Sequence, residues 1–180
     1  MTSTRFDRSR LLDPSPPAAT VVHDVGLLLL RLVVGLTMAA HGTMKLFGWF
    51  GGPGLTATGK GFSTAGYPAG DAMAVIAGLS ETLGGLGLAL GLLTPLAGAA
   101  LTGVFINILE VRGFGAYFPP KGVELEVVLF ASVIALTLTG PGRYAVDHHL
   151  PVLRASRPQY SLLALLVGAV AGFVVLLIRD

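Results

Sequence analysis

Ionisable side chains occur inside two long apolar stretches of this sequence. Residues 25–44 contain Arg31 and His41 as their only ionisable residues, and residues 72–93 contain only Glu81. A charge at the centre of a bilayer costs about 2.5 to 3.5 kcal/mol, so charges that are kept there usually pair inside a helical bundle or line a water-filled cavity. The pattern therefore predicts an internal polar site in a membrane protein. Such a site could hold the polar group of a ligand or move a proton, but it does not name a reaction.

The spacing of the basic residues places them on one side of the first apolar helix. His41 and Lys45 are four residues apart and share a helix face, and Arg31 lies on nearly the same stripe as Lys45. With a cytoplasmic N-terminus, His41 and Lys45 approach the external side of the membrane. We expect them to pair with Glu81, or with Glu110 at the end of a later apolar stretch, in a water-accessible pocket.

Each of these residues also has a structural explanation. Arg31 and Lys45 could extend their charges to the two membrane interfaces, and Glu81 could be a structural ion-pair partner of Arg31 or His41. Glu124 begins a later apolar stretch, where favourable interaction with the helix dipole is a sufficient explanation. The catalytic role is unassigned, and the candidates for ligand binding or proton handling are Arg31, His41, Lys45, Glu81, Glu110 and Glu124.

The composition excludes several kinds of chemistry. The sequence has no cysteine, so disulfides, thiol nucleophiles and thiolate metal sites are excluded from the chain itself. No metal-ligand spacing stands out, and a bis-histidine haem needs two intramembrane histidines, of which His41 is the only clear one. No cofactor motif is evident. The net charge of +2 is small and the basic residues are dispersed, so nucleic acid is not an expected partner.

The whole composition is that of an integral membrane protein. Of 180 residues, 53% are hydrophobic and 12% are charged, which leaves little sequence for a soluble domain. We predict an all-α membrane helical bundle with short connections. Spans of about 20 apolar residues are needed, and five candidates lie near residues 25–47, 72–93, 95–111, 123–139 and 161–178.

The connections between these stretches carry local signals. The segment 48–70 is rich in glycine and is predicted to be a loop with aromatic residues at the membrane interface. Asp71 is the expected N-cap of the second span. Thr94, followed by Pro95, is the expected N-cap of the third, which makes these two spans a tight hairpin.

Glycines spaced four residues apart predict close contacts between helices. Gly87 and Gly91 form one such pair, and Gly168 and Gly172 form another. We favour packing within the chain over dimerisation, because this spacing is common in helical membrane bundles. A homo-oligomer remains an open alternative.

The distribution of basic residues predicts the orientation. Residues 1–20 are polar and contain prolines, which is typical of a disordered tail. Six basic residues precede the first span or lie between the fourth and fifth, against four on the opposite side, so we expect a cytoplasmic N-terminus and an external C-terminus. The first group is Arg5, Arg8, Arg10, Arg143, Arg154 and Arg157, and the second is Lys60, Arg112, Lys121 and Arg179.

Several short motifs, taken in order, resemble the DoxX family. They extend from about residue 28 to residue 147 and comprise Arg31, Gly35, His41-Gly42-x-x-Lys45, Glu81-x-x-Gly84-Gly85, Gly91-x-x-Thr94-Pro95, Glu124-x-Glu126 and Gly140-Pro141-Gly142 through Asp147. The resemblance implies a four-helix domain over residues 21–150 in a bacterial inner-membrane protein. Residues 151–180 would then add a linker and a fifth, C-terminal span. Relatives serve as small subunits of thiosulfate:quinone oxidoreductase or of membrane complexes linked to sulfur and oxidative-stress metabolism.

Two main functions follow as hypotheses. The first is a membrane redox subunit that binds a quinone or similar lipid-soluble molecule and receives electrons from a protein partner, since the chain shows no redox centre of its own. In it, His41, Lys45 and Glu81 would supply hydrogen bonds and a proton route. The second is a non-enzymatic scaffold or assembly factor. Small-solute transport is a third class, although no inverted repeat or paired broken helices support it.

Overall fold

The computed structural model describes residues 17–118, 120, 122–150 and 158–179, and every regular element in them is a helix. The predicted tail falls mostly on residues 1–16, outside the described residues, but the first helix already begins at Pro17, before the expected end of the tail. The linker expected after residue 150 also lies largely outside them. The elements are α1 (Pro17–Phe47), η2 (Trp49–Gly51), α2 (Gly54–Thr64), α3 (Gly70–Leu90), α4 (Thr94–Arg112), α5 (Glu124–Thr139), α6 (Val146–His149) and α8 (Pro158–Leu177).

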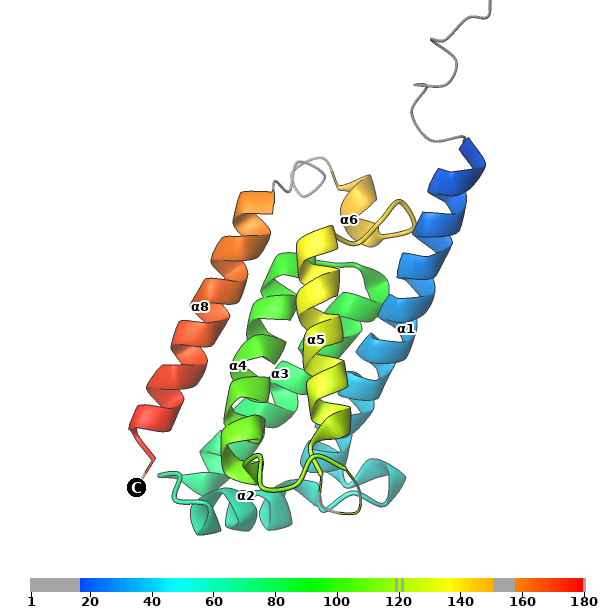
Figure 1. The fold of residues 1–180 in the computed structure, drawn as a ribbon. Helices are drawn as coiled ribbons and strands as arrows, with labels where there is room; N and C mark the ends of the chain where they lie inside the picture. The colour runs from blue at the N-terminus through cyan, green and yellow to red at the C-terminus, as the bar shows by residue number, and fades with distance from the viewer. Residues whose placement is uncertain (1–16, 119, 121, 151–157, 180) are drawn as a thin grey trace, which may run out of the picture.

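The long helices form one bundle (Figure 1). α1 packs mainly on α3, and α4 packs on α3, α5 and α8. The short helix α2 lies across one end of the bundle and α6 lies at the other end. α1 begins and α8 ends at opposite ends of the bundle (Figure 1). The buried core between the helices is apolar and includes Met38, Leu88, Leu101, Phe105 and Val133.

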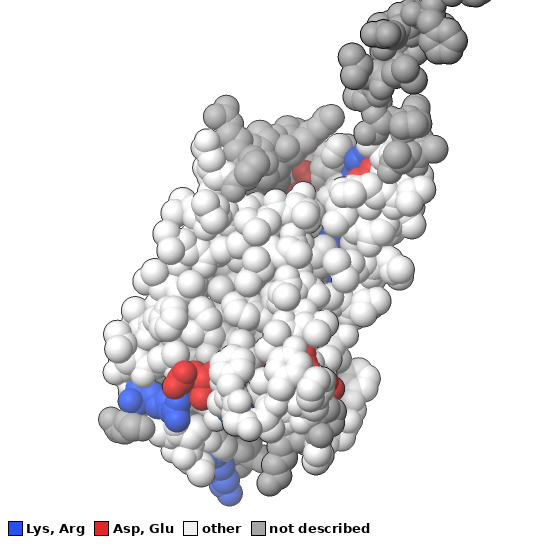
Figure 2. All heavy atoms as spheres, viewed as in Figure 1, with Lys and Arg blue, Asp and Glu red and all other residues white. Residues whose placement is uncertain are grey.

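Four helices are long and apolar enough to cross a membrane, and they span Thr20–Phe47, Gly70–Leu90, Thr94–Arg112 and Gln159–Leu177. The predicted all-α membrane bundle with a C-terminal span is therefore confirmed. The predicted count of five spans is not confirmed, because only four helices among the described residues meet the requirement. α5 has 16 residues, or about 24 Å at 1.5 Å per residue, which is shorter than a hydrocarbon core of about 30 Å. It nevertheless lies alongside the spans. Figure 2 shows that the side of the bundle in this view is almost uncharged, with charges near its ends.

The predicted loop 48–70 is only partly a loop. It contains η2 and the eleven-residue helix α2, which sequence reasoning missed because glycine and threonine are poor helix formers. α2 is held by packing on the start of α3. There Gly59 faces Asp71 so closely that a side chain in its place would collide with the carboxyl group.

Both predicted N-caps are wrong by one or two residues. Ala69 is the N-cap of α3 and Asp71 lies in the first turn, while Leu93 is the N-cap of α4 and Thr94 is its first residue. The cap of α4 comes instead from a distant segment. The Asp147 carboxylate accepts hydrogen bonds from the backbone N–H groups of Leu93 (2.8 Å) and Thr94 (3.0 Å), which are otherwise unpaired at a helix start.

The small residues pack within the chain, as predicted. A methyl group on Gly172 would lie 3.0 Å from the Cα atom of Gly103, and Gly168 faces the backbone of Ala99. These contacts bring α8 against α4. In the other pair, Gly91 faces the guanidinium group of Arg31. Close backbone packing of this kind is a main source of helix association in lipid.

The α1–α3 contact sets the register of the candidate site. A methyl group on Gly35 would lie 2.6 Å from the backbone nitrogen of Ala89, so only glycine permits the observed approach. Seven residues further along α1, a methyl group on Gly42 would likewise collide with Thr82 of α3. Because the two helices are antiparallel, this register places Lys45 opposite Glu81.

Candidate ligand pocket between α3, α4 and α8

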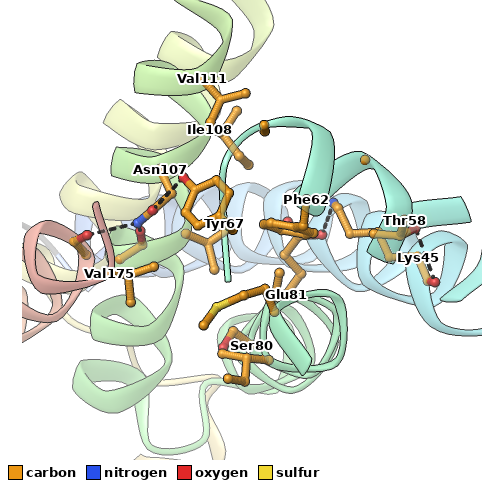
Figure 3. A pocket seen from close by; sticks show the side chains of 18 of the residues that line it. Lys45, Thr58, Phe62, Tyr67, Ser80, Glu81, Asn107, Ile108, Val111 and Val175 are labelled. Atoms are coloured by element: carbon orange, nitrogen blue, oxygen red, sulfur yellow. Dashed lines mark hydrogen bonds and ion pairs between the residues drawn. The ribbon is translucent and has the colours of Figure 1, made fainter. Parts of the chain in front are cut away.

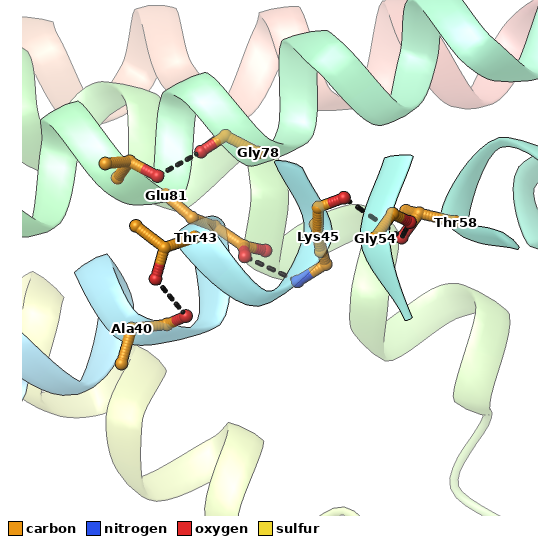
Figure 4. A network of polar contacts seen from close by, with 8 residues as sticks. Ala40, Thr43, Lys45, Gly54, Thr58, Gly78 and Glu81 are labelled. Carbon is orange, nitrogen blue, oxygen red and sulfur yellow. Dashed lines mark hydrogen bonds and ion pairs between the residues drawn. The ribbon is translucent and has the colours of Figure 1, made fainter. Parts of the chain in front are cut away.

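An ion pair links α1 and α3 in the interior of the bundle. Lys45 donates through Nζ to Glu81 Oε2 at 2.5 Å (Figure 4). The Glu81 side chain is 0% exposed and the Lys45 side chain is 24% exposed. The expected pairing of Lys45 with Glu81 is therefore present. The ammonium of Lys45 does not simply extend to the membrane interface.

The second oxygen of Glu81 is different. Oε1 is buried and has no hydrogen-bond partner among the described residues. An unpaired buried acceptor costs about 1 to 3 kcal/mol, and more when it is charged. Lys45 has three donor hydrogens, of which the pair with Glu81 needs one. Glu81 and Lys45 thus hold hydrogen-bonding capacity that the protein leaves unused.

This pair lies in the wall of a cavity of about 580 Å³ (Figure 3). The cavity is bounded by α2, α3, α4 and α8, and most of its lining is apolar, with Phe62, Ile76, Ile108 and Val175 among the larger side chains. Lipophilic ligands typically occupy cavities of about 300 to 1,000 Å³ that have a few placed polar groups. The cavity has the size and chemistry of such a site.

A second polar group closes the cavity near α2. Tyr67 donates through its hydroxyl to Asn107 Oδ1 (2.9 Å), and Asn107 Nδ2 donates to the carbonyl oxygens of Gly103 (2.9 Å) and Gly172 (3.1 Å). Asn107 therefore connects α4 to α8 and to the segment before α3. Arg179 lies over the Tyr67 ring and donates through Nε to the Ala65 carbonyl (2.7 Å).

Tyr67 lies outside the spans and keeps its proton. Burial raises the pKa of its hydroxyl above the ordinary value, Arg179 opposes the rise and Glu110 adds to it. The hydroxyl is therefore a donor at neutral pH, in agreement with its bond to Asn107.

The other sequence candidates do not line this cavity. His41 is half-buried on α1 and close enough to act electrostatically on Glu81. Glu110 is exposed near the end of α4, and of the two partners expected for Lys45 the structure pairs it with Glu81. Glu124 is half-buried in the first turn of α5. A surface ion pair nearby joins Arg112 and Glu126.

Arg31 belongs to a second polar cluster toward the other end of the bundle. It is 1% exposed, so its charge is enclosed by groups of the protein. Its guanidinium group donates to the carbonyl oxygens of Pro141 and Tyr144, and Asp147 acts on it electrostatically. This cluster fastens the segment after α5 to α1 and to the start of α4. These contacts give Arg31 a structural role.

Sequence reasoning missed Tyr67 and Arg179 as parts of the site, and it missed Asp147 as a cap. Their partners are far away in the chain, so no local spacing identifies them. Within the described residues, no group of three or more metal-binding side chains could hold a metal ion.

Comparisons with known proteins agree with the architecture. Residues 26–111 match the family model described as DoxX. The match covers α1 from residue 26 onward, both members of the Lys45–Glu81 pair and nearly all of α4, while α5 and α8 lie beyond it. No curated protein and no solved structure matched the chain. The family match, together with four membrane-spanning helices, identifies the chain as a DoxX family membrane protein with its family domain at residues 26–111.

Proposed function

We propose that the cavity binds a lipid-soluble molecule with a hydrogen-bonding head group, and that a quinone is the class of molecule that fits it best. The observation that carries the proposal is the combination of an apolar cavity of about 580 Å³ with a buried carboxylate oxygen that lacks a partner. Apolar walls match a hydrophobic ring and tail, which they would hold by close packing contacts. The Lys45–Glu81 pair then orients the head group.

The chemistry of the pair suits a quinone carbonyl. Lys45 has N–H groups free to donate to a carbonyl oxygen, and Glu81 can exchange a proton through Oε1. Reduction of a quinone to a quinol takes two electrons and two protons. Glu81 and His41 would handle protons, and the electrons would come from a protein partner, since the chain has no cysteine.

The protein would accordingly be a subunit of a membrane system linked to redox, sulfur or oxidative-stress metabolism in a bacterial inner membrane. With the cytoplasmic N-terminus that the basic residues favour, the cavity lies toward the external side, because α1 ends there. A partner that delivers electrons would then approach the end of the bundle covered by α2.

Mass spectrometry of extracts from the gently purified protein tests this function. Wild type is expected to retain a quinone or related lipid at a fixed ratio, and Glu81→Gln to lose most of it. Thr139→Val, which removes a hydroxyl from the exposed surface of α5, is a control expected to retain it. If wild type carries no such molecule and binds none when it is supplied, the proposal is wrong.

A scaffold or assembly factor is the second candidate, and one observation favours it. Two of the buried charges, Arg31 and Glu81, also bind groups of the protein that fix helix positions. On this alternative, Glu81→Gln lowers thermal stability and recovery of a partner together, without a separable loss of ligand. Stability and ligand content measured on the same variant distinguish the two functions.

A further inference from the structure

The cavity opens at the side of the bundle, between α3 and α8. Both helices line it, and both pack against α4, which forms its back wall. Seven lining residues are exposed. Five of them lie on or beside α2 and at the end of α4, namely Pro53, Ala57, Gly61, Val111 and Arg112. The other two, Ile76 on α3 and Ala171 on α8, mark the edges of the opening between these helices. Because α3 and α8 are both long and apolar enough to span a membrane, the opening between them faces the acyl chains of the lipid.

Small residues leave this opening unfilled. The α4 wall carries Ala99, Ala100 and Gly103, and the α8 wall carries Gly168 and Ala171. Larger side chains at these positions would occupy the space that a hydrocarbon chain needs. From Ala99 to Asn107 the α4 wall extends over about 12 Å at 1.5 Å per residue. The result is a slot with small residues along its back and a charged pair in its wall.

The α8 wall is held in place by polar contacts. Asn107 donates to the Gly172 carbonyl at 3.1 Å, and Arg179 anchors the end of α8 to the Ala65 carbonyl at 2.7 Å. Both contacts involve α8 or the residues after it, which lie outside the family domain at residues 26–111. The part of the chain beyond that domain therefore completes the cavity.

We propose that the ligand enters the cavity sideways from the bilayer between α3 and α8, and that its hydrocarbon tail remains between Ile76 and Ala171. The inference rests on the proposed function and adds that the ligand is a tailed amphiphile whose tail α8 selects. Ala171 is the residue that sets how thick a tail can pass. The head group contacts Lys45 and Glu81.

Two probes with the same head group distinguish the contribution of the tail to binding from that of the head group. One is a benzoquinone with a decyl tail and the other is the same ring without a tail. Binding of each is measured at equilibrium with the full chain in lipid nanodiscs. Ala171→Phe is expected to weaken binding of the tailed probe by about tenfold, equivalent to about 1.4 kcal/mol, and to change binding of the tail-free probe by less than about twofold.

Val174→Phe is the matched control, because Val174 lies on the same helix, is 53% exposed and does not line the cavity. It should change binding of neither probe. Ile76→Trp narrows the opening from the α3 side and should repeat the result of Ala171→Phe, even if the latter variant does not fold. Suppose that wild type binds both probes in a Glu81-dependent way and that both narrowing variants bind the tailed probe normally. The inference about side entry is then overturned, while the proposed function stands. If wild type binds neither probe, the proposed function fails with it.

Discussion

At the scale of single residues, the asymmetry between Lys45 and Glu81 decides how the site behaves. Glu81 is fully buried, whereas Lys45 retains 24% exposure of its side chain. Removing one partner of a buried pair leaves an uncompensated charge, which is costly when that charge cannot reach water. A lysine left alone can extend toward the interface, but a carboxylate at the position of Glu81 cannot.

Lys45→Met should therefore destabilise the protein more than Glu81→Gln. We expect a loss in free energy of unfolding of about 3 kcal/mol for Lys45→Met and about 1 kcal/mol for Glu81→Gln, with the double variant recovering part of the first loss. Reversible unfolding in mixed micelles measures these differences. Equal losses in the two single variants would show that Glu81 is not held as a buried anion.

The sequence predicted this pair but not the groups around it. The cost of charge in lipid singles out Lys45 and Glu81 wherever they occur in an apolar stretch. Tyr67, Asn107 and Arg179 meet only because α2 and α8 fold back toward the same end of the bundle. No spacing in the chain encodes those contacts, so they could not be predicted residue by residue.

At the scale of elements, the position of α8 on α4 is the feature that completes the cavity. A Cβ atom at position 172 would lie 3.3 Å from Ile106 Cβ, close to the usual separation of about 3.8 Å in a disulfide. Because the chain has no cysteine, a pair of introduced cysteines reports this contact with no native thiol to compete.

The double variant Ile106→Cys/Gly172→Cys should form an intramolecular disulfide rapidly under mild oxidation. Ile106→Cys/Val174→Cys is the control, because Val174 is exposed on α8 and faces away from the contact. Mobility on a non-reducing gel after cleavage between the helices measures the bond. Equal or faster cross-linking of the control pair would contradict the observed packing of α8.

The long apolar stretches predicted four spans well, because length and composition alone determine them. The same criterion failed for α5 and α2. α5 is apolar but short, and its place in the bundle comes from packing of residues such as Val133. α2 has no strong apolar pattern, and tertiary contacts with α3 supply the stability that its composition lacks.

At the scale of the whole molecule, the orientation in the membrane determines which side a partner can reach. The two ends of the bundle are marked by α2 and by the segment around α6. Lys60 is exposed on α2, and Tyr144 is 51% exposed near α6. The distribution of basic residues predicts that Lys60 is external and Tyr144 cytoplasmic.

Single cysteines at these two positions test the orientation in intact cells. A membrane-impermeant maleimide should label Lys60→Cys, and it should label Tyr144→Cys only after the membrane is opened. The reverse pattern would place the cavity toward the cytoplasm and move the expected partner to that side. It would leave the Lys45–Glu81 site itself unchanged.

The most direct measurement of the central claim is photolabelling with a tailed quinone that carries a photoreactive group on its ring. After illumination in membranes, peptide mass spectrometry locates the attached probe. We predict adducts on cavity-lining residues of α3, α4 and α8, competed by unmodified tailed quinone and lost in Glu81→Gln. Adducts confined to the outward, lipid-facing surfaces of these helices, unchanged by competitor or by Glu81→Gln, would show that the cavity between α3, α4 and α8 is not a quinone site.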